Sequence, residues 1–228
     1  MPRESPVGRD AVIVIATIKT ILPVECNRQT NFVGNIRNMA NEPGDRAPAP
    51  GALRLVQRFI NTNDLEGGPE QLPNAAALRE WLRAADLLDV SAEVSAADHR
   101  RAIELREALR GLAAAHGGLP HDPNAQEIVN EAARRALLRP VLDDPVAMRL
   151  EPEAAGVDAA LGRIVAAVHA AIGEGTWQRL KACERDVCRW AFYDRSKNQS
   201  GHWCSMSVCG QREKSRRAYR RRRARGAA

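Results

Sequence analysis

Four cysteines near the C-terminus form two pairs of equal spacing, a pattern suited to binding a metal ion. Four residues separate Cys183 from Cys188 and Cys204 from Cys209, and fifteen residues lie between the pairs. Zinc(II) favours four deprotonated ligands arranged as a tetrahedron, and thiolates are common among them. Because four protein ligands leave no open coordination position, we expect one structural Zn²⁺ ion and no catalysis at the metal.

Other states of these cysteines remain open at this point. Two disulfides could form in an oxidising compartment, four free thiols are a further alternative, and four-thiolate sites also hold iron. His202 precedes Cys204 by two residues and could replace one sulfur. Such a histidine is more often a surface or DNA-facing neighbour, so we leave it out of the expected ligand set.

An arginine-rich segment follows the second cysteine pair directly. Residues 212–225 contain eight Arg, one Lys and one Glu, a local charge of +8. The whole chain carries +6, so the rest of the chain carries −2. A near-neutral body with a basic C-terminal segment indicates an anionic partner, DNA before RNA or a membrane surface.

The basic segment contains no helix-breaking residue after Lys214, and we predict a helix there. On that helix Arg216, Arg220 and Arg223 share one face, with Arg212 and Tyr219 nearby. Arginine suits phosphates and guanine edges because its guanidinium is planar. The alternatives are a solvated tail and an RNA-binding arm. The candidate nucleic-acid-binding residues are Arg212, Lys214, Arg216, Arg217, Arg220 and Arg223.

The N-terminal apolar stretch, residues 11–22, is interrupted by Lys19 and lacks a small-residue cleavage site. We therefore expect no signal peptide, no membrane-spanning segment and a cytoplasmic location. In the cytoplasm, clustered cysteines are more often metal ligands than disulfides.

The chain is expected to divide into three parts. Residues 1–47 are an asparagine-containing extension or flexible arm, or an extra strand. Met39 offers an alternative start, which would make residues 1–38 an upstream extension. Residues 48–174 are expected to form a helical domain, and residues 175–228 a zinc finger with a basic C-terminal helix.

The apolar residues of the body recur at helical spacing and predict five helices. The first carries Leu53 to Ile60 and the second starts after Asn74. The third starts at a capping box, Ser95 and Asp98. The fourth starts at Asn124 and Glu127 with Leu137 inward, and the fifth has Leu161 and Ile172 inward. A short β-hairpin around the turn at residues 143–145 is expected between the last two helices.

The body shows no pattern typical of an enzyme. HExxH, Walker and GxGxxG motifs are missing from the sequence, and the histidines are scattered. Asn61, Thr62 and Arg106 are polar residues close to apolar helical faces, and they could line a small-ligand pocket. The other interpretation is structural, with Asn61 and Thr62 ending the first helix and Arg106 pairing with an acid.

The cysteine segment resembles the CGNR zinc finger, and the body resembles the ABATE domain that usually accompanies it. The body is similar at Leu53-Arg54-Leu55-Val56 and at Leu105-Arg106-Glu107-Ala108-Leu109-Arg110. Gln211 stands where the family signature has Asn. The residues that carry the finger's resemblance are Cys188-Arg189-Trp190, Trp203-Cys204 and Cys209-Gly210-Gln211-Arg212.

The resemblance implies a mainly α protein that ends in a small treble-clef-like four-cysteine zinc finger. It also implies a stress-linked bacterial transcription regulator that binds DNA. The helical domain would then sense a small-molecule effector or form a homodimer. The alternative is a zinc-stabilised protein- or RNA-interaction module without sequence-specific DNA binding.

Overall fold

The computed structural model describes residues 48–120, 122–145 and 147–226. The interpretations of residues 1–47 given above lie outside these described residues. Within them the chain is mainly α-helical, as the sequence predicts. The helices are α2 (Leu53–Ile60), α3 (Ala75–Ala84), α4 (Ala96–Ala115), α5 (Ala125–Arg135), α6 (Gly156–Gly173) and α7 (Gln211–Gly226).

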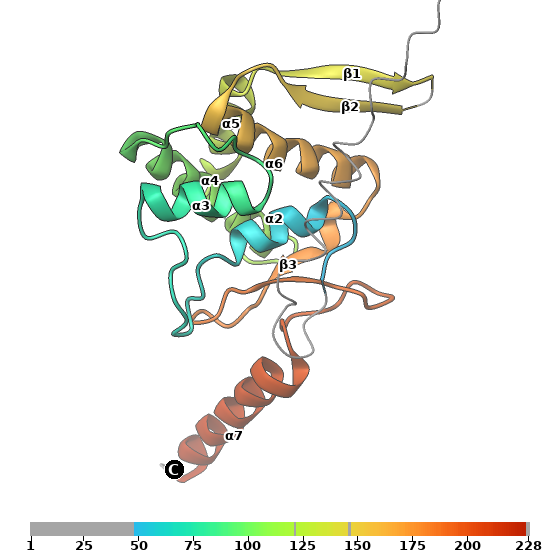
Figure 1. Ribbon diagram of the computed structural model, residues 1–228. Coiled ribbons are helices and arrows are strands. Elements are labelled where there is room, and N and C mark those ends of the chain that lie inside the picture. The colour runs from blue at the N-terminus through green and yellow to red at the C-terminus, as the bar shows by residue number, and fades with distance from the viewer. Residues whose placement is uncertain (1–47, 121, 146, 227–228) are drawn as a thin grey trace, which may run out of the picture.

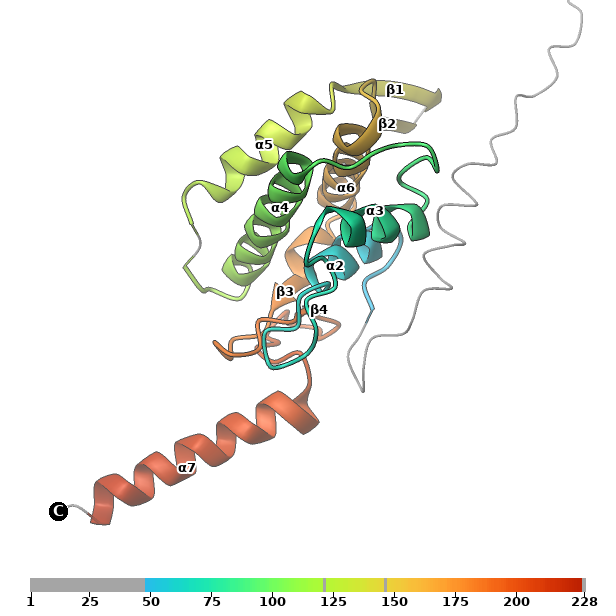
Figure 2. The same ribbon diagram turned by 60° about the vertical axis from the view of Figure 1, so that its left-hand side comes forward.

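Five helices pack together, whereas α7 projects away from them (Figures 1 and 2). The core lies where α2, α4 and α6 meet, and Phe59, Leu105 and Ile164 are at most 1% exposed there. Ten residues of α6 are buried. By length and composition alone α6 could cross a membrane, with a mean hydropathy of 1.3, which the sequence analysis did not anticipate. Its position in the core accounts for that apolar composition.

Two of the three expected helix starts have the expected caps. The Asn74 side chain accepts a hydrogen bond from the Ala77 amide at 3.0 Å, and Ser95 and Asp98 form a complete capping box. Asn124 instead has helical backbone angles, and its side chain makes no capping hydrogen bond. The fourth helix nevertheless begins at Asn124 as expected, with Glu127 in its first turn, and the Asp122 carboxylate accepts the Asn124 amide hydrogen at 2.8 Å.

Two residues predicted to point inward are exposed. Leu137 lies beyond the end of α5, has a φ of 52° and is 58% exposed. The left-handed backbone turns the chain from α5 into the first strand, so the helical period no longer applies there. Ile172, in the last turn of α6, is also 58% exposed, whereas the neighbouring Ala171 is 1% exposed, so the core covers only the Ala171 side of that turn.

The expected hairpin is present as β1 (Leu138–Asp144) and β2 (Ala147–Pro152), which pair antiparallel. It lies at the end of the molecule opposite α7 in both views (Figures 1 and 2). Gly162 of α6 lets the chain entering β1 come close, since a Cβ on Gly162 would be 2.3 Å from the Ala136 Cβ.

A second hairpin, which the sequence analysis did not predict, joins the zinc segment to the body. Its strands are β3 (Leu180–Ala182) and β4 (Ala191–Tyr193), preceded by a 3₁₀ turn, η1 (Trp177–Arg179). The side chains of Trp177, Leu180, Ala182 and Ala191 are buried in the same core as the five helices. The hairpin that carries the cysteines is thus also part of the body's core.

Candidate metal centre and basic helix

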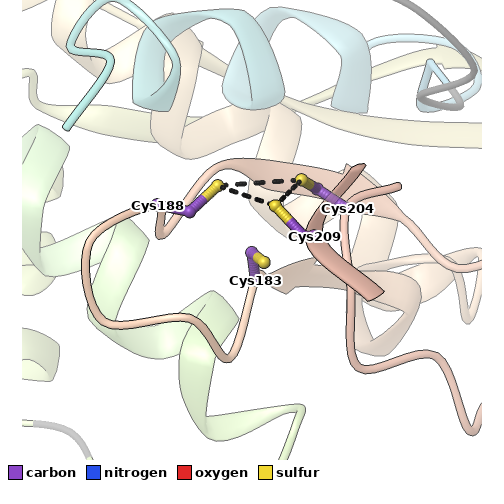
Figure 3. A group of neighbouring side chains, drawn as sticks. All are labelled: Cys183, Cys188, Cys204 and Cys209. Atoms are coloured by element: carbon purple, nitrogen blue, oxygen red, sulfur yellow. Dashed lines mark hydrogen bonds between the residues drawn. The ribbon is translucent and has the colours of Figure 1, made fainter. Parts of the chain in front are cut away.

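The four cysteines of the two pairs gather at one buried point (Figure 3). Their sulfur atoms all lie within 4.8 Å of one another. The Sγ of Cys204 is 3.7 Å from that of Cys188 and 3.6 Å from that of Cys209. A tetrahedral zinc site with Zn–S bonds of about 2.3 Å places its sulfurs about 3.8 Å apart, whereas a disulfide bond is about 2.0 Å long. The spacing fits one structural zinc ion, and the cysteines are not joined by disulfides.

Each cysteine pair is held by a short turn next to regular structure. Cys183 directly follows β3, and its amide donates to the Trp190 carbonyl at 3.0 Å, which continues the β3–β4 ladder. The second pair spans η2 (Met206–Gly210), a π-helical turn that leads into α7. The Ser205 hydroxyl accepts the Val208 amide hydrogen at 3.1 Å at the start of that turn. The metal centre and the first residue of α7 are therefore separated by a single turn.

The electrostatics of the buried thiols favour a cation among them. Hydrogen bonds from the Cys188 and Cys204 thiols lower the pKa of Cys183 to about 4. The same contacts with Cys183 raise the pKa values of Cys188 and Cys204, and burial raises them further. Protein groups alone thus favour a thiolate at Cys183 and oppose thiolates at Cys188 and Cys204. A bound dication would stabilise all four thiolates, which is the state that zinc requires.

Charged side chains lie next to the four cysteines but are not part of their cluster. Arg185 Nη1 lies 3.7 Å from the Cys209 sulfur and donates to the Glu66 carboxylate at 2.6 Å. His202, left out of the expected ligand set, is exposed and pairs with Glu184 through Nδ1. Within the described part of the chain, the cluster of metal-binding side chains consists of the four cysteines and does not include His202.

The aromatic residues of the segment divide between two cores. Trp190 and Phe192 pack with the cysteines, and Trp203 covers the same cluster. Trp177 lies instead in the core of the body, and Tyr219 is 62% exposed. The small core around the metal is therefore only part of the arrangement, and the segment also contributes to the core of the body.

Asn61, a candidate pocket residue, joins the body to the zinc segment. Its amide nitrogen donates to the Ala191 carbonyl at 2.9 Å, and its Oδ1 accepts the Ala191 amide hydrogen at 2.8 Å. Gln57 donates to the same carbonyl at 3.2 Å. Both side chains come from α2 and are buried. The role of Asn61 at this junction was not predicted, because a residue at a helix end gives no sign of its partner 130 residues later.

The other two candidate pocket residues have partners within the body. The Thr62 hydroxyl donates to the Phe59 carbonyl at 2.8 Å, which closes the end of α2. Arg106 is buried, and its guanidinium donates two hydrogen bonds of 2.7 Å to the Glu70 carboxylate. A cavity of the body lies elsewhere, between α4, α5 and α6. In the structure Thr62 thus lies at the end of α2 and Arg106 pairs with an acid.

The basic helix α7 contacts mainly η2, and its charged side chains are exposed except for Glu213. Arg212 pairs with Glu66 of the body, and Arg216 and Arg217 pair with Glu213 at 2.7 and 3.1 Å. Among the described residues, no acidic group pairs with Lys214, Arg220 or Arg223. The structure thus divides the six candidate residues into three that are ion-paired and three that are not.

Two family models match successive parts of the chain. The ABATE model, described as "Putative stress-induced transcription regulator", matches residues 53–175. The CGNR zinc finger model matches residues 179–223, which include all four clustered cysteines. A comparison with curated proteins gives no significant match.

Proposed function

The chain belongs to the ABATE family and carries a C-terminal CGNR zinc finger, and from this premise we propose that it is a DNA-binding transcription regulator. In this proposal it acts in the cytoplasm and has no enzymatic activity. Zinc stabilises the fold of the DNA-binding segment, and α7 contacts the DNA.

The observation that carries the proposal is the position of α7. The helix starts directly after the turn that holds Cys209 and projects away from the body (Figure 2). Its sequence places basic residues all around the helix. A helix that is polar all around gains little from packing against its own protein. The major groove of DNA admits an α-helix and surrounds it with phosphates from both strands. The phosphates along the groove would neutralise the positive charges of α7.

The helical body has the features needed for a regulatory role. A cavity of about 280 Å³ lies between α4, α5 and α6, with Leu105, Ile128 and Leu161 among its apolar walls. Arg101 and Arg135 lie at the same cavity, and both donate hydrogen bonds to Asp158. Glu104, Glu127 and Glu131 also line the cavity, so its apolar walls are joined by carboxylates as well as guanidinium groups. A concave site with convergent polar groups suits a small polar molecule. We place the effector of the proposed regulator here rather than at Asn61, Thr62 and Arg106, whose polar groups are already bonded.

The proposal is tested by the salt dependence of binding to a labelled short duplex. Each phosphate contact contributes about 0.9 to the slope of log affinity against log salt. Replacing Arg220 and Arg223 together with Gln is expected to weaken binding and reduce the slope by up to about two. The matched control removes two charges from exposed arginines of the body, Arg134→Gln with Arg139→Gln, and is expected to leave the slope unchanged.

Failure to bind duplex DNA at low salt would contradict the proposal. Tight binding to RNA or to a protein, together with weak binding to duplex DNA, would favour the alternative of a zinc-stabilised interaction module. Equal slopes for the wild type and the Arg220/Arg223 variant would show that these two arginines do not contact phosphates.

A further inference from the structure

A groove runs between the zinc segment and the first half of α7, on the helix face opposite the predicted one. Its volume is about 250 Å³. The predicted face carries Arg216, Arg220 and Arg223, and none of these lines the groove. The lining residues are Trp203, Met206, Gly210, Glu213, Lys214, Arg217 and Arg221.

One wall of the groove is apolar. Trp203 packs against the cysteine cluster with part of its surface and lines the groove as well. Met206 beside it is 69% exposed. Gly210 allows this wall to form, because a Cβ there would lie 3.2 Å from the Met206 sulfur and 3.3 Å from Trp203 Cδ1. A large aromatic ring and a thioether are thus presented to solvent beside the metal centre.

The opposite wall is cationic. Lys214, Arg217 and Arg221 follow one another at spacings of three and four residues, which places them on one face of α7. Arg217 pairs with Glu213, which also lines the groove. Lys214 and Arg221 have no acidic partner in the described part of the chain. Three cations against one carboxylate leave an excess of positive charge, so the groove favours an anionic ligand.

The apolar wall and the cationic wall together indicate that the ligand is a nucleotide. An aromatic wall facing unpaired cations fits a planar ring attached to phosphates, since bases stack on aromatic side chains and phosphates bind Arg and Lys. Met206, Lys214 and Arg221 on its walls are exposed, so the groove is open to solvent and does not enclose a ligand. It suits one unit of a polymer better than a free effector.

We propose that this groove binds a single nucleotide of DNA whose base has left the helical stack. The base would lie against Trp203 and Met206, and its flanking phosphates would contact Lys214 and Arg221. A base within a stacked duplex cannot enter a concave site, and enzymes that reach single bases extrude them for this reason. The inference rests on the proposed DNA binding and adds to it a preference for unpaired or easily unstacked positions.

The test compares a fully paired DNA duplex with the same duplex carrying one unpaired, bulged base. Stacking on one aromatic side chain is expected to make the wild-type protein bind the bulged duplex about tenfold more tightly. Trp203→Ala is expected to lose this preference while still binding the paired duplex, and Trp203→Phe to retain most of it. Zinc content, measured on each variant, verifies that the metal centre is intact.

A charge-matched pair of variants separates the two faces of α7. Lys214→Gln with Arg221→Gln is expected to reduce the preference for the bulge, because these residues line the groove. Arg220→Gln with Arg223→Gln removes the same charge from outside the groove. This double variant is expected to bind the paired and the bulged duplex more weakly by the same factor. A loss of preference in both double variants would contradict a role for the groove.

Each outcome has a distinct meaning. Equal wild-type affinity for paired and bulged duplexes would overturn the nucleotide site and leave the proposed function in place, whereas failure to bind either would overturn both. Adenosine monophosphate, titrated as a free nucleotide, is expected not to compete at micromolar concentration. Competition by it, or a stronger preference for the corresponding single-stranded RNA, would contradict the assignment to DNA.

Discussion

The Glu66 carboxylate accepts a hydrogen bond from Arg185 at 2.6 Å, across 119 residues of sequence. Arg185 also lies 3.7 Å from the sulfur of Cys209, and Glu66 pairs in addition with Arg212 at the start of α7. One carboxylate of the body thus contacts both the neighbourhood of the metal centre and the base of the projecting helix. This arrangement gives the helical body a direct route to influence the orientation of α7.

Glu66→Gln is expected to weaken this junction. The variant keeps the side-chain shape and removes the charge, so we expect a loss of about 1 kcal/mol of stability, the upper range for partly exposed ion pairs. It should also alter DNA affinity, because Arg212 would be released. Chemical denaturation and duplex binding are the measurements. Glu80→Gln, which removes an exposed acid paired with Arg83, is the control and should change neither.

The same junction should depend on pH in the acidic range. Partial burial raises the pKa of Glu66, but Arg185 and Arg212 outweigh this effect and lower the pKa below 4.5. A depressed folded-state pKa stabilises the protein above about pH 4.5, and this contribution is lost as the pH falls through the folded value. The stability difference between wild type and Glu66→Gln should therefore shrink as the pH is lowered below 4.5. A constant difference down to pH 3 would contradict the ion pair.

Loss of zinc is expected to destabilise the body as well as the zinc segment. Two separable modules would leave the helices unaffected when Cys204 is replaced. In the structure, however, Leu180 and Ala191 of the cysteine-bearing hairpin are buried in the body's core. Cys204→Ala or chelation should therefore lower the melting temperature of the helical signal in circular dichroism. Cys26→Ala, which changes the cysteine that belongs to neither pair in the sequence, is the control, and an unchanged melting temperature after chelation would refute the shared core.

Asn61→Ala is expected to cost about 2 to 3 kcal/mol, because it leaves the buried Ala191 amide without its partner and removes one of the two donors to the Ala191 carbonyl, while Gln57 still donates to that carbonyl. Asn74→Ala removes one exposed helix cap and should cost only about 1 kcal/mol. Urea denaturation of the two variants provides the comparison. Equal costs would mean that the contact between α2 and β4 contributes no more than a surface cap.

Asp194 should make the zinc segment sensitive to acid. Although burial raises its pKa, the Lys181 ammonium at 2.9 Å and the Ser196 and Gly201 groups lower the pKa far below 3.8. Because the pKa of Asp194 is lowered in the folded state, its contribution to stability is complete above about pH 4 and is lost as the pH falls further. Asp194→Asn leaves Lys181 buried without its counter-charge and should cost about 3 to 5 kcal/mol at neutral pH. A melting temperature within error of the wild type would contradict this.

Local patterns predicted much of this molecule. The four cysteines, the caps at Asn74 and Ser95 and the hairpin turn after Leu142 each depend on residues close in sequence. The inward positions of Leu137 and Ile172 were wrong for a related reason, since helical spacing does not indicate where a helix leaves its core. Periodicity can locate a helix, but its neighbours decide which side is covered.

The contacts that connect the two parts could not be predicted. Asn61 with Ala191 and Glu66 with Arg185 bring together residues more than 100 positions apart, and neither residue type is unusual in its local setting. The spacing of the arginines indicated the face of Arg216, Arg220 and Arg223 for nucleic acid. It gave no sign that the opposite face would form a groove with the zinc segment, because that depends on how α7 leaves the metal centre.

The most direct test of the central claim is selection of duplex DNA from a random pool at physiological salt, with Cys204→Ala selected in parallel. We predict that the wild type enriches a defined sequence motif and that the variant enriches none. Salt-sensitive retention of DNA without any motif, or the same motif from both proteins, would contradict a zinc-dependent, sequence-specific regulator.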